Sequence, residues 1–264
     1  IYPALDIPTD QQGQTLYDWV NISAGYAYTC GVRLGGCLAC WGDNRQGQST
    51  PPFTEDGEPY QDWIKVSTGG ASQSFTCGLH ADGSLECWGS NDYGQLTPPT
   101  EDEQGISLSP WVDLHSGYQH SCGLLADGRI RCWGSDQFGQ STTPTELELD
   151  VLINEGSEGL EGPWISVGAG YAHSCGLRAG GAIYCWGINS ENQSNPTNWD
   201  AQGRPRYWRV MSVGGFHGCG VDDDQELICW GSNYTGQSNV PIELFGDAYH
   251  DWIEVVAGRH HSCG

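Results

Sequence analysis

Residues 111–140 read WVDLHSGYQHSCGLLADGRIRCWGSDQFGQ, and this stretch decides the fold. Two short runs of strand-forming residues flank Ala-Asp-Gly at 126–128, which is typical of a tight β-hairpin with glycine in the left-handed conformation. Counting inward from Cys122 and Cys132, both ends meet at Asp127, so the two cysteines face the same side of the hairpin at cross-strand distance. The stretch therefore predicts a β-hairpin that is closed by its own disulfide.

The same pattern recurs along the chain, and a repeat of this length indicates an array or a propeller. Each copy opens with a tryptophan, reaches Cys-Gly, then Cys-Trp-Gly, and ends in a Gly-Gln turn. The opening tryptophans are Trp19, Trp63, Trp111, Trp164, Trp208 and Trp252. The predicted disulfide pairs are Cys30 with Cys40, Cys77 with Cys87, Cys122 with Cys132, Cys175 with Cys185, and Cys219 with Cys229. We therefore predict an all-β fold, a single β-propeller domain over residues 1–264 whose four-stranded antiparallel blades come from six repeat units.

The sixth repeat is incomplete, because the sequence stops one residue after Cys263 and before a Cys-Trp-Gly strand. Three explanations stay open: the chain continues, residues 1–18 close or bridge this blade, or a neighbouring molecule supplies the missing strand. An unpaired strand edge is normally covered or used for pairing. The five hairpin pairs leave Cys37 and Cys263 over, and a disulfide between these two, within or between chains, is a further hypothesis.

The composition limits the cellular compartments in which the protein is expected and the classes of partner that it is expected to bind. The formal net charge of -23 argues against nucleic acid or an anionic membrane surface, because both need Lys and Arg to meet their phosphates. No run of about 20 apolar residues is present, so membrane insertion is not expected. The first ten residues, IYPALDIPTD, lack a charged region followed by an apolar one, so we expect any secretory signal to have been removed. The 12 cysteines fit an oxidising compartment, and we expect a secreted or cell-surface protein.

The ordered set of Trp, Gly-Tyr-x-His-Ser-x-Gly, Asp-Gly, Trp-Gly and Gly-Gln resembles the repeat of the regulator of chromosome condensation family. This resemblance covers nearly the whole chain, and it implies a circular propeller. The cysteine-paired version is most similar to extracellular members, such as the ectodomains of crinkly-type plant receptor kinases and secreted bacterial propellers. The nuclear exchange-factor activity of the founding member is not implied.

Side chains that could carry chemistry occupy repeated positions, which favours structural roles. His120, His173, His217 and His261 share one slot with Tyr28 and Phe75, so this slot accepts aromatic rings in every repeat. Cys37-Leu-Ala-Cys40 has the spacing of a redox or zinc motif, but Cys40 already has Cys30 as its repeat-defined partner. No nucleophile elbow, phosphate loop or zinc-protease motif is present. We therefore predict no catalytic residue, no metal site and no cofactor.

Three sequons predict N-glycosylation in a secreted eukaryotic chain. They begin at Asn21, Asn192 and Asn233. Asn192 and Asn233 fall in turns after Cys-Trp-Gly, whereas Asn21 lies near a strand. The variable linkers between repeats are where a rigid scaffold carries its specificity.

These observations predict a non-catalytic extracellular structural or interaction scaffold. It would be a subunit of a surface assembly or filament, joined through its incomplete sixth blade, with a protein partner or self-association. The alternative is a ligand- or protein-recognising propeller module, either a receptor ectodomain or an inhibitor.

Overall fold

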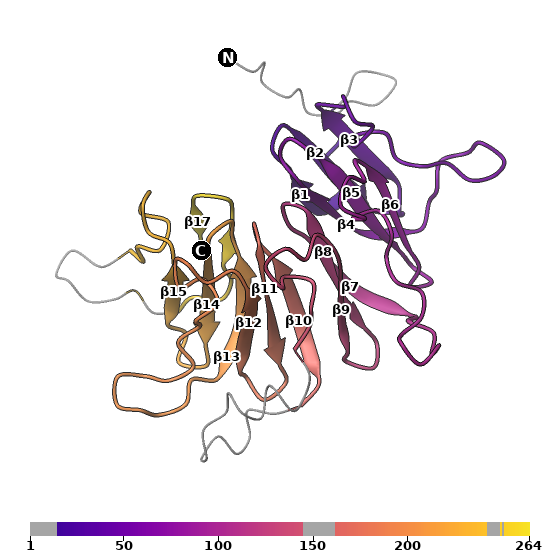
Figure 1. Cartoon of the computed structure of the whole chain (residues 1–264). Helices are drawn as coiled ribbons and strands as arrows, with labels where there is room; N and C mark the ends of the chain where they lie inside the picture. Colours follow the sequence, from indigo (N-terminus) through magenta and orange to yellow (C-terminus); the bar gives the residue numbers. More distant parts are fainter. Residues whose placement is uncertain (1–14, 145–161, 242–248, 250) are drawn as a thin grey trace. The chain divides into compact units, whose positions relative to one another are not determined.

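The computed structural model describes residues 15–144, 162–241, 249 and 251–264, and the described residues form β-strands and turns with no helix (Figure 1). They group into two compact parts. The N-terminal part comprises residues 1–126 and 133–135, and the C-terminal part comprises residues 127–132 and 136–264. The prediction of one domain over 1–264 stays a prediction, and so does the closing role of residues 1–18, of which 1–14 lie outside the described residues.

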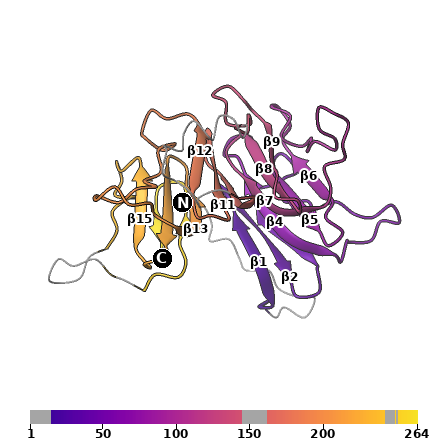
Figure 2. The same cartoon turned by 90° about the horizontal axis from the view of Figure 1, so that it is seen from below.

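Repeats one to three each form a three-stranded antiparallel sheet, in the strand orders β1-β2-β3, β4-β5-β6 and β7-β8-β9. The strands are β1 (Trp19–Ala24), β2 (Tyr28–Arg33), β3 (Leu38–Gly42), β4 (Trp63–Gly69), β5 (Phe75–His80), β6 (Leu85–Gly89), β7 (Trp111–Ser116), β8 (His120–Leu125) and β9 (Ile130–Gly134). The first strands of successive sheets lie side by side, since β4 contacts both β1 and β7 (Figures 1 and 2).

Repeats four and five form sheets of the same kind, β10-β11-β12 and β13-β14-β15. Their strands are β10 (Trp164–Ala169), β11 (His173–Arg178), β12 (Ile183–Gly187), β13 (Trp208–Val213), β14 (His217–Asp222) and β15 (Leu227–Gly231). Repeat six contributes a two-stranded sheet of β16 (Val256–Ala257) and β17 (Ser262–Cys263).

The sequence predicted four strands per blade, and the described residues give three in each of the five full repeats. Three linkers that were expected to hold a fourth strand form small hairpins closed by isolated bridges, Phe53 to Pro59, Glu101 to Ser107 and Trp199 to Pro205, while residues 145–161 and 242–248 of the other two linkers lie outside the described residues. Their tight loops each contain a glycine with positive φ, such as Gly57 at 80°. These residues hydrogen-bond within the linker and leave no long extended segment to pair with the sheet.

The recurring Cys-Gly pair has a packing reason that the spacing alone did not reveal. A Cβ atom on Gly78 would lie 2.3 Å from the indole of Trp63, the tryptophan that opens the same repeat. The glycine after the first cysteine meets its own repeat's tryptophan in the same way in all six repeats. Only glycine therefore lets the opening indole lie flat on the central strand.

The buried clusters are shared between successive repeats, because the disulfide and second strand of one repeat pack against the opening tryptophan and the Cys-Trp-Gly tryptophan of the next. The ring centroids of Trp63 and Trp88 are 5.8 Å apart, and the equivalent pairs of the other full repeats lie at 5.5 to 6.2 Å. Aromatic pairs at this distance add to the energy of burial. Each core is therefore built at the junction of two repeats, which suits an array in which every copy is stabilised by its neighbours.

Candidate functional site

The hairpin disulfides are present, as the spacing predicted. Cys30–Cys40, Cys77–Cys87, Cys175–Cys185 and Cys219–Cys229 have Cα atoms 4.0 to 4.1 Å apart. Cys122 and Cys132 are disulfide-bonded as well. The first cysteine of each pair is fully buried, directly opposite its partner in the strand register. Each bond joins the second and third strands of one repeat.

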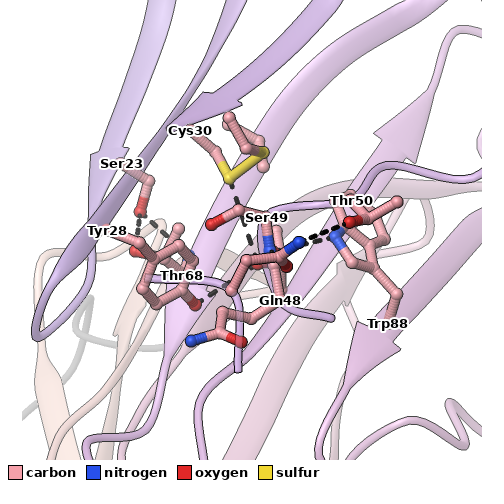
Figure 3. The surroundings of a disulfide bond; sticks show 12 residues. Ser23, Tyr28, Cys30, Gln48, Ser49, Thr50, Thr68 and Trp88 are labelled. Carbon is pink, nitrogen blue, oxygen red and sulfur yellow. Dashed lines mark hydrogen bonds between the residues drawn. A yellow bond between two sulfur atoms is a disulfide. The ribbon is translucent and has the colours of Figure 1, made fainter. Parts of the chain in front are cut away.

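The Gly-Gln turn ties one repeat to the next, which the sequence did not indicate. The side-chain Oε1 of Gln48 accepts a hydrogen bond from the backbone N of Gln46, 2.9 Å away, and so closes its own turn. The backbone carbonyl of Gln48 then accepts the indole Nε1–H of Trp88 in the next repeat, at 3.0 Å (Figure 3). The same indole bond joins Gln95 to Trp133, Gln140 to Trp186 and Gln193 to Trp230, at 3.0 to 3.1 Å.

A hydroxyl group on the next repeat's central strand binds this carbonyl too. Thr76 Oγ1 donates to the carbonyl of Gln48 at 2.8 Å, and Ser174 Oγ donates to that of Gln140 at 2.9 Å. Each of these carbonyls thus accepts two hydrogen bonds from the following repeat. Buried Gln48 is tolerated here because its side-chain oxygen, its side-chain nitrogen and its main-chain carbonyl all have partners.

The one departure from Gly-Gln is explained by backbone geometry. Gly47, Gly94, Gly139 and Gly236 all have φ between 77° and 82°. Asn192, which replaces glycine in repeat four, has φ of 59°. Asparagine is among the few residues that adopt this left-handed conformation at small cost. The substitution therefore keeps the turn.

At repeat six, the carbonyl of Gln237 is the equivalent hydrogen-bond acceptor, but the residues around it are arranged differently. The carbonyl of Gln237 accepts a hydrogen bond from Ser262 Oγ at 2.9 Å, as in the earlier repeats. Beside it lies a cavity of about 250 Å³, lined by residues that include Gln237, Val240, Trp252, Cys263 and Gly264. Trp252 is half-buried, whereas the opening tryptophans of repeats two to five are buried. Among the described residues, β17 has β16 as its only strand partner.

The two remaining cysteines are free thiols, Cys37 half-buried and Cys263 exposed. The hypothesised disulfide between them is therefore not formed within the chain in this structure, and a bond between chains stays a prediction. Cys263 stands where the first, buried cysteine of each earlier pair stands.

The histidine slot holds a buried ring in each of the five full repeats, whereas His261 of repeat six is exposed, and two of the buried rings bond to the next repeat. Tyr28 donates its hydroxyl to the carbonyl of Phe75. His217 Nε2 lies 2.8 Å from Ser262 Oγ, and since Ser262 gives its one proton to Gln237, the imidazole donates and its Nδ1 carries no proton. Burial, with His261 and His260 nearby, lowers the pKa of His217 to about 4. The ring is neutral at physiological pH, which suits a structural role.

One polar group lies between first strands of the N-terminal part and is not repeated elsewhere. Lys65 on β4 forms an ion pair with Asp113 on β7. Burial, followed by the charge of Lys65, lowers the pKa of His115 to about 4. The pair crosses from one repeat to the next, as do the bonds from Val66 N to Asn21 Oδ1 and from Ser116 N to Ser67 Oγ. We therefore assign it to contacts between repeats.

The predicted glycosylation residues lie in different surroundings. Asn192 and Asn233 are exposed in the turns after β12 and β15. Asn21 lies in β1, and its side-chain oxygen accepts the backbone N–H of Val66 at 2.8 Å. The fold therefore leaves two of the three sequons accessible, and occupancy stays a prediction for all of them.

In the described ranges, no three His, Cys, Asp or Glu side chains are placed to hold one metal ion. Asp222 of the acidic run 222–224 pairs with Arg206 at 2.7 Å, so this carboxylate is already used. No membrane-spanning helix was found in the same residues.

Three-stranded antiparallel sheets, each opened by a tryptophan and stapled by a hairpin disulfide, define a repeat protein with propeller-type blades. A profile of the regulator of chromosome condensation (RCC1) repeat matches residues 19–48, 64–95, 111–140, 164–193 and 209–237, which is more than half of the chain. The chain therefore belongs to the RCC1-repeat family. A search of curated protein sequences gave no match.

Solved structures share the fold. The ectodomain of receptor kinase CR4 from Physcomitrella patens is 24% identical with a TM-score of 0.60, over 92% of this chain and 57% of that one. The CRINKLY ectodomain of Arabidopsis thaliana ACR4 is 21% identical with a TM-score of 0.60, over 93% and 76%. Prp20p from Saccharomyces cerevisiae is 18% identical with the same score, over 92% and 67%. The chain thus spans little more than half of the moss ectodomain.

Proposed function

We propose that this chain is a non-catalytic extracellular protein-interaction scaffold. The observation that carries the proposal is the disulfide inside each of the five full RCC1-type repeats. Disulfides of this kind persist in oxidising compartments and are rare in the cytosol and nucleus. The solved neighbours include receptor ectodomains, while Prp20 is described in complex with Kap60 and as a binder of Gsp1p and histones. Among these neighbours, Prp20 is described with protein partners, and this supports a protein-interaction role.

The rigid parts and the variable parts of the chain support this role. The disulfides close each full repeat, the indole bonds to the glutamine carbonyls join it to its neighbour, and both recur with little change. The linkers differ in sequence and present exposed side chains, such as Phe53 and Ile106 at 56% exposure each. Variable loops on a stiff frame are a common way to build a binding surface.

Within this role we favour a structural subunit of a surface assembly, joined through repeat six. The open edge of β17 and the cavity beside Gln237 support association at that place. The alternative is a receptor ectodomain or inhibitor that recognises one ligand, and the likeness to the CR4 and ACR4 ectodomains favours it.

Expression with and without secretion tests the scaffold proposal. We expect the secreted protein to contain the five hairpin disulfides by peptide mapping without reduction, and the protein made in a reducing cytosol to be less stable and partly unfolded. Electron micrographs of the secreted protein separate the two versions, since fibres support the assembly subunit and discrete particles support the ligand-binding module. Equal stability with all the thiols reduced would contradict the extracellular assignment.

A further inference from the structure

We infer that Thr97 is a site of O-linked glycosylation, with a nucleotide-activated N-acetylhexosamine as the sugar donor. Thr97 lies in the linker between the second and third repeats, and its side chain is exposed. The inference rests on the proposed extracellular role, because the enzymes that build O-linked chains on threonine beside proline act on secreted proteins. The modified atom is a hydroxyl oxygen, so this site is independent of the three asparagine sequons.

Two prolines follow Thr97, and the tripeptide Thr-Pro-Pro occurs twice in the chain, at 50–52 and 97–99. Both copies lie outside the strands. A proline keeps the residue before it extended, and it has no backbone N–H to offer to a sheet. Each threonine is therefore held in an extended segment, which is the form that a glycosyltransferase cleft can accept. Threonine or serine beside proline is also the composition typical of O-glycosylated segments.

The turn after Cys-Trp-Gly normally binds the side chain at the repeat position of Thr97. In four of the five full repeats, this side chain is hydrogen-bonded to the side chain six residues before it. The pairs, donor first, are Asn44 Nδ2 with Thr50 Oγ1, Thr142 Oγ1 with Asp136 Oδ2, Asn189 Nδ2 with Asn195 Oδ1, and Asn233 Nδ2 with Asn239 Oδ1, at 2.7 to 3.1 Å. The bond holds the side chain against its own turn.

Repeat two lacks this bond. Asn91, six residues before Thr97, accepts the backbone N–H of Leu96 at 3.0 Å, but among the described residues the Thr97 hydroxyl has no hydrogen-bond partner. Thr50 is exposed as well and begins the same tripeptide, yet its oxygen accepts the Asn44 amide at 2.8 Å. The chain therefore contains a matched pair of Thr-Pro-Pro segments, one with a free hydroxyl and one with a bound hydroxyl.

The free oxygen of Thr97 is the nucleophile of the transfer. Thr97 Oγ1 attacks the anomeric carbon of the sugar donor, and a C–O glycosidic bond forms. The bond between that carbon and the phosphate oxygen breaks, and the nucleoside diphosphate leaves with the electron pair. The hydroxyl proton passes to the leaving phosphate, and nothing is oxidised or reduced. At Thr50 the oxygen must first lose the Asn44 amide, so the same reaction is disfavoured there.

Secretion of the chain from cultured animal cells tests the inference. The protein is treated to remove N-glycans, and peptide mapping with a fragmentation method that preserves the sugar then locates any O-linked N-acetylhexosamine. We expect the sugar on Thr97 at about five times its occupancy on Thr50, because one hydrogen bond of ordinary strength shifts an equilibrium by about that factor. Thr97→Val should remove this glycan, and Thr50→Val, the matched control, should leave it in place.

A third variant tests the role of the hydrogen bond. Asn44→Ala frees the Thr50 hydroxyl, and it should raise the sugar occupancy of Thr50 to near that of Thr97 while Thr97 stays unchanged.

The unmodified sequence decides the matter even if this variant does not fold. A bare Thr97, or equal occupancy at Thr97 and Thr50, would overturn the inference. The same peptide maps report the five hairpin disulfides, which separates the two proposals. Intact disulfides with a bare Thr97 count against the glycosylation site alone, whereas reduced cysteines in the secreted protein count against the extracellular scaffold.

Discussion

The indole Nε1 of Trp88 donates a hydrogen bond to the backbone carbonyl of Gln48, 3.0 Å away, and so joins the second repeat to the first. Trp41 occupies the equivalent position in repeat one, where the described residues offer its Nε1 no acceptor. The same residue type at the same repeat position therefore has two different roles. This difference gives a matched pair of variants for measuring the bond between repeats.

Trp88→Phe should lower the free energy of unfolding more than Trp41→Phe. Phenylalanine keeps most of the ring but loses the N–H, which leaves the Gln48 carbonyl with Thr76 as its remaining side-chain donor. A buried hydrogen bond of this kind contributes about 1 kcal/mol, and the smaller ring adds a cavity cost. Chemical denaturation of both variants measures the difference. Equal losses would show that the indole bond contributes nothing beyond packing.

Gly78→Ala should destabilise the protein strongly, because the new Cβ would meet the Trp63 indole at 2.3 Å. Overpacking of a tight core costs about 1 to 3 kcal/mol. The Trp63 ring would have to shift within the cluster that it forms with Tyr28 and Cys30, so the near-ultraviolet circular dichroism should change as well. Gln104→Ala in the exposed hairpin of the second linker serves as the control and should leave both signals unchanged. A Gly78→Ala protein as stable as the parent would contradict this role of the glycine.

Whether a contact could be predicted from the sequence depends on how far apart its two residues lie along the chain. The hairpin disulfides were predictable because Cys122 and Cys132 lie symmetrically about one turn. The role of Gln48 was not, because its carbonyl bonds a residue of the next repeat and no local pattern reports a main-chain acceptor. The sequence offered one indication of this contact. In the first three repeats, each Gly-Gln is followed, in the next repeat, by the tryptophan of Cys-Trp-Gly, and these two residues form the bond.

The fourth strand of each blade was predicted from the sequence but is not present in the described residues. Its prediction came with the propeller expectation and not from a strand pattern in the linkers, which contain Pro, Gly and acidic residues. The described linkers fold on themselves, with Asp102 Oδ1 accepting backbone N–H groups of Gln104 and Ile106 at 3.0 and 2.8 Å. Such side-chain bonds compete with sheet formation.

Removing one hairpin disulfide should cost stability without unfolding the chain. Replacing both Cys77 and Cys87 by Ala opens a closed loop of ten residues. The chain-entropy account gives a loss of about 2 to 3 kcal/mol for a loop of this size. Cys37→Ser, which removes a thiol outside the five pairs, should be close to neutral. Denaturation without reductant compares the three proteins, and an unchanged midpoint for the double variant would contradict the prediction.

Acidification should destabilise the interface between repeats five and six through His217. Its pKa is about 4 in the folded chain and 6.5 as the ordinary value, so the unfolded state binds more protons between these two pH values. The stabilisation is complete above pH 6.5 and is lost as the pH falls toward 4. His217→Tyr, which copies Tyr28 of repeat one, should flatten the pH dependence of the unfolding free energy in this window. Gln104→Ala, in the exposed hairpin of the second linker, should leave this pH dependence unchanged.

Glycan occupancy should follow the accessibility of the three sequons. Asn192 and Asn233 are exposed in turns, and a glycan on either would extend into solvent. The side chain of Asn21 instead lies against the neighbouring first strand, where its oxygen accepts the Val66 N–H at 2.8 Å. In a eukaryotic secretory host, peptide mapping should find glycan at Asn192 and Asn233 and a bare Asn21. Asn21→Gln should then lower stability while leaving the glycan mass unchanged, because the longer amide displaces the oxygen from Val66. Glycan on Asn21 in folded protein would show that β1 opens away from β4 before the chain is modified.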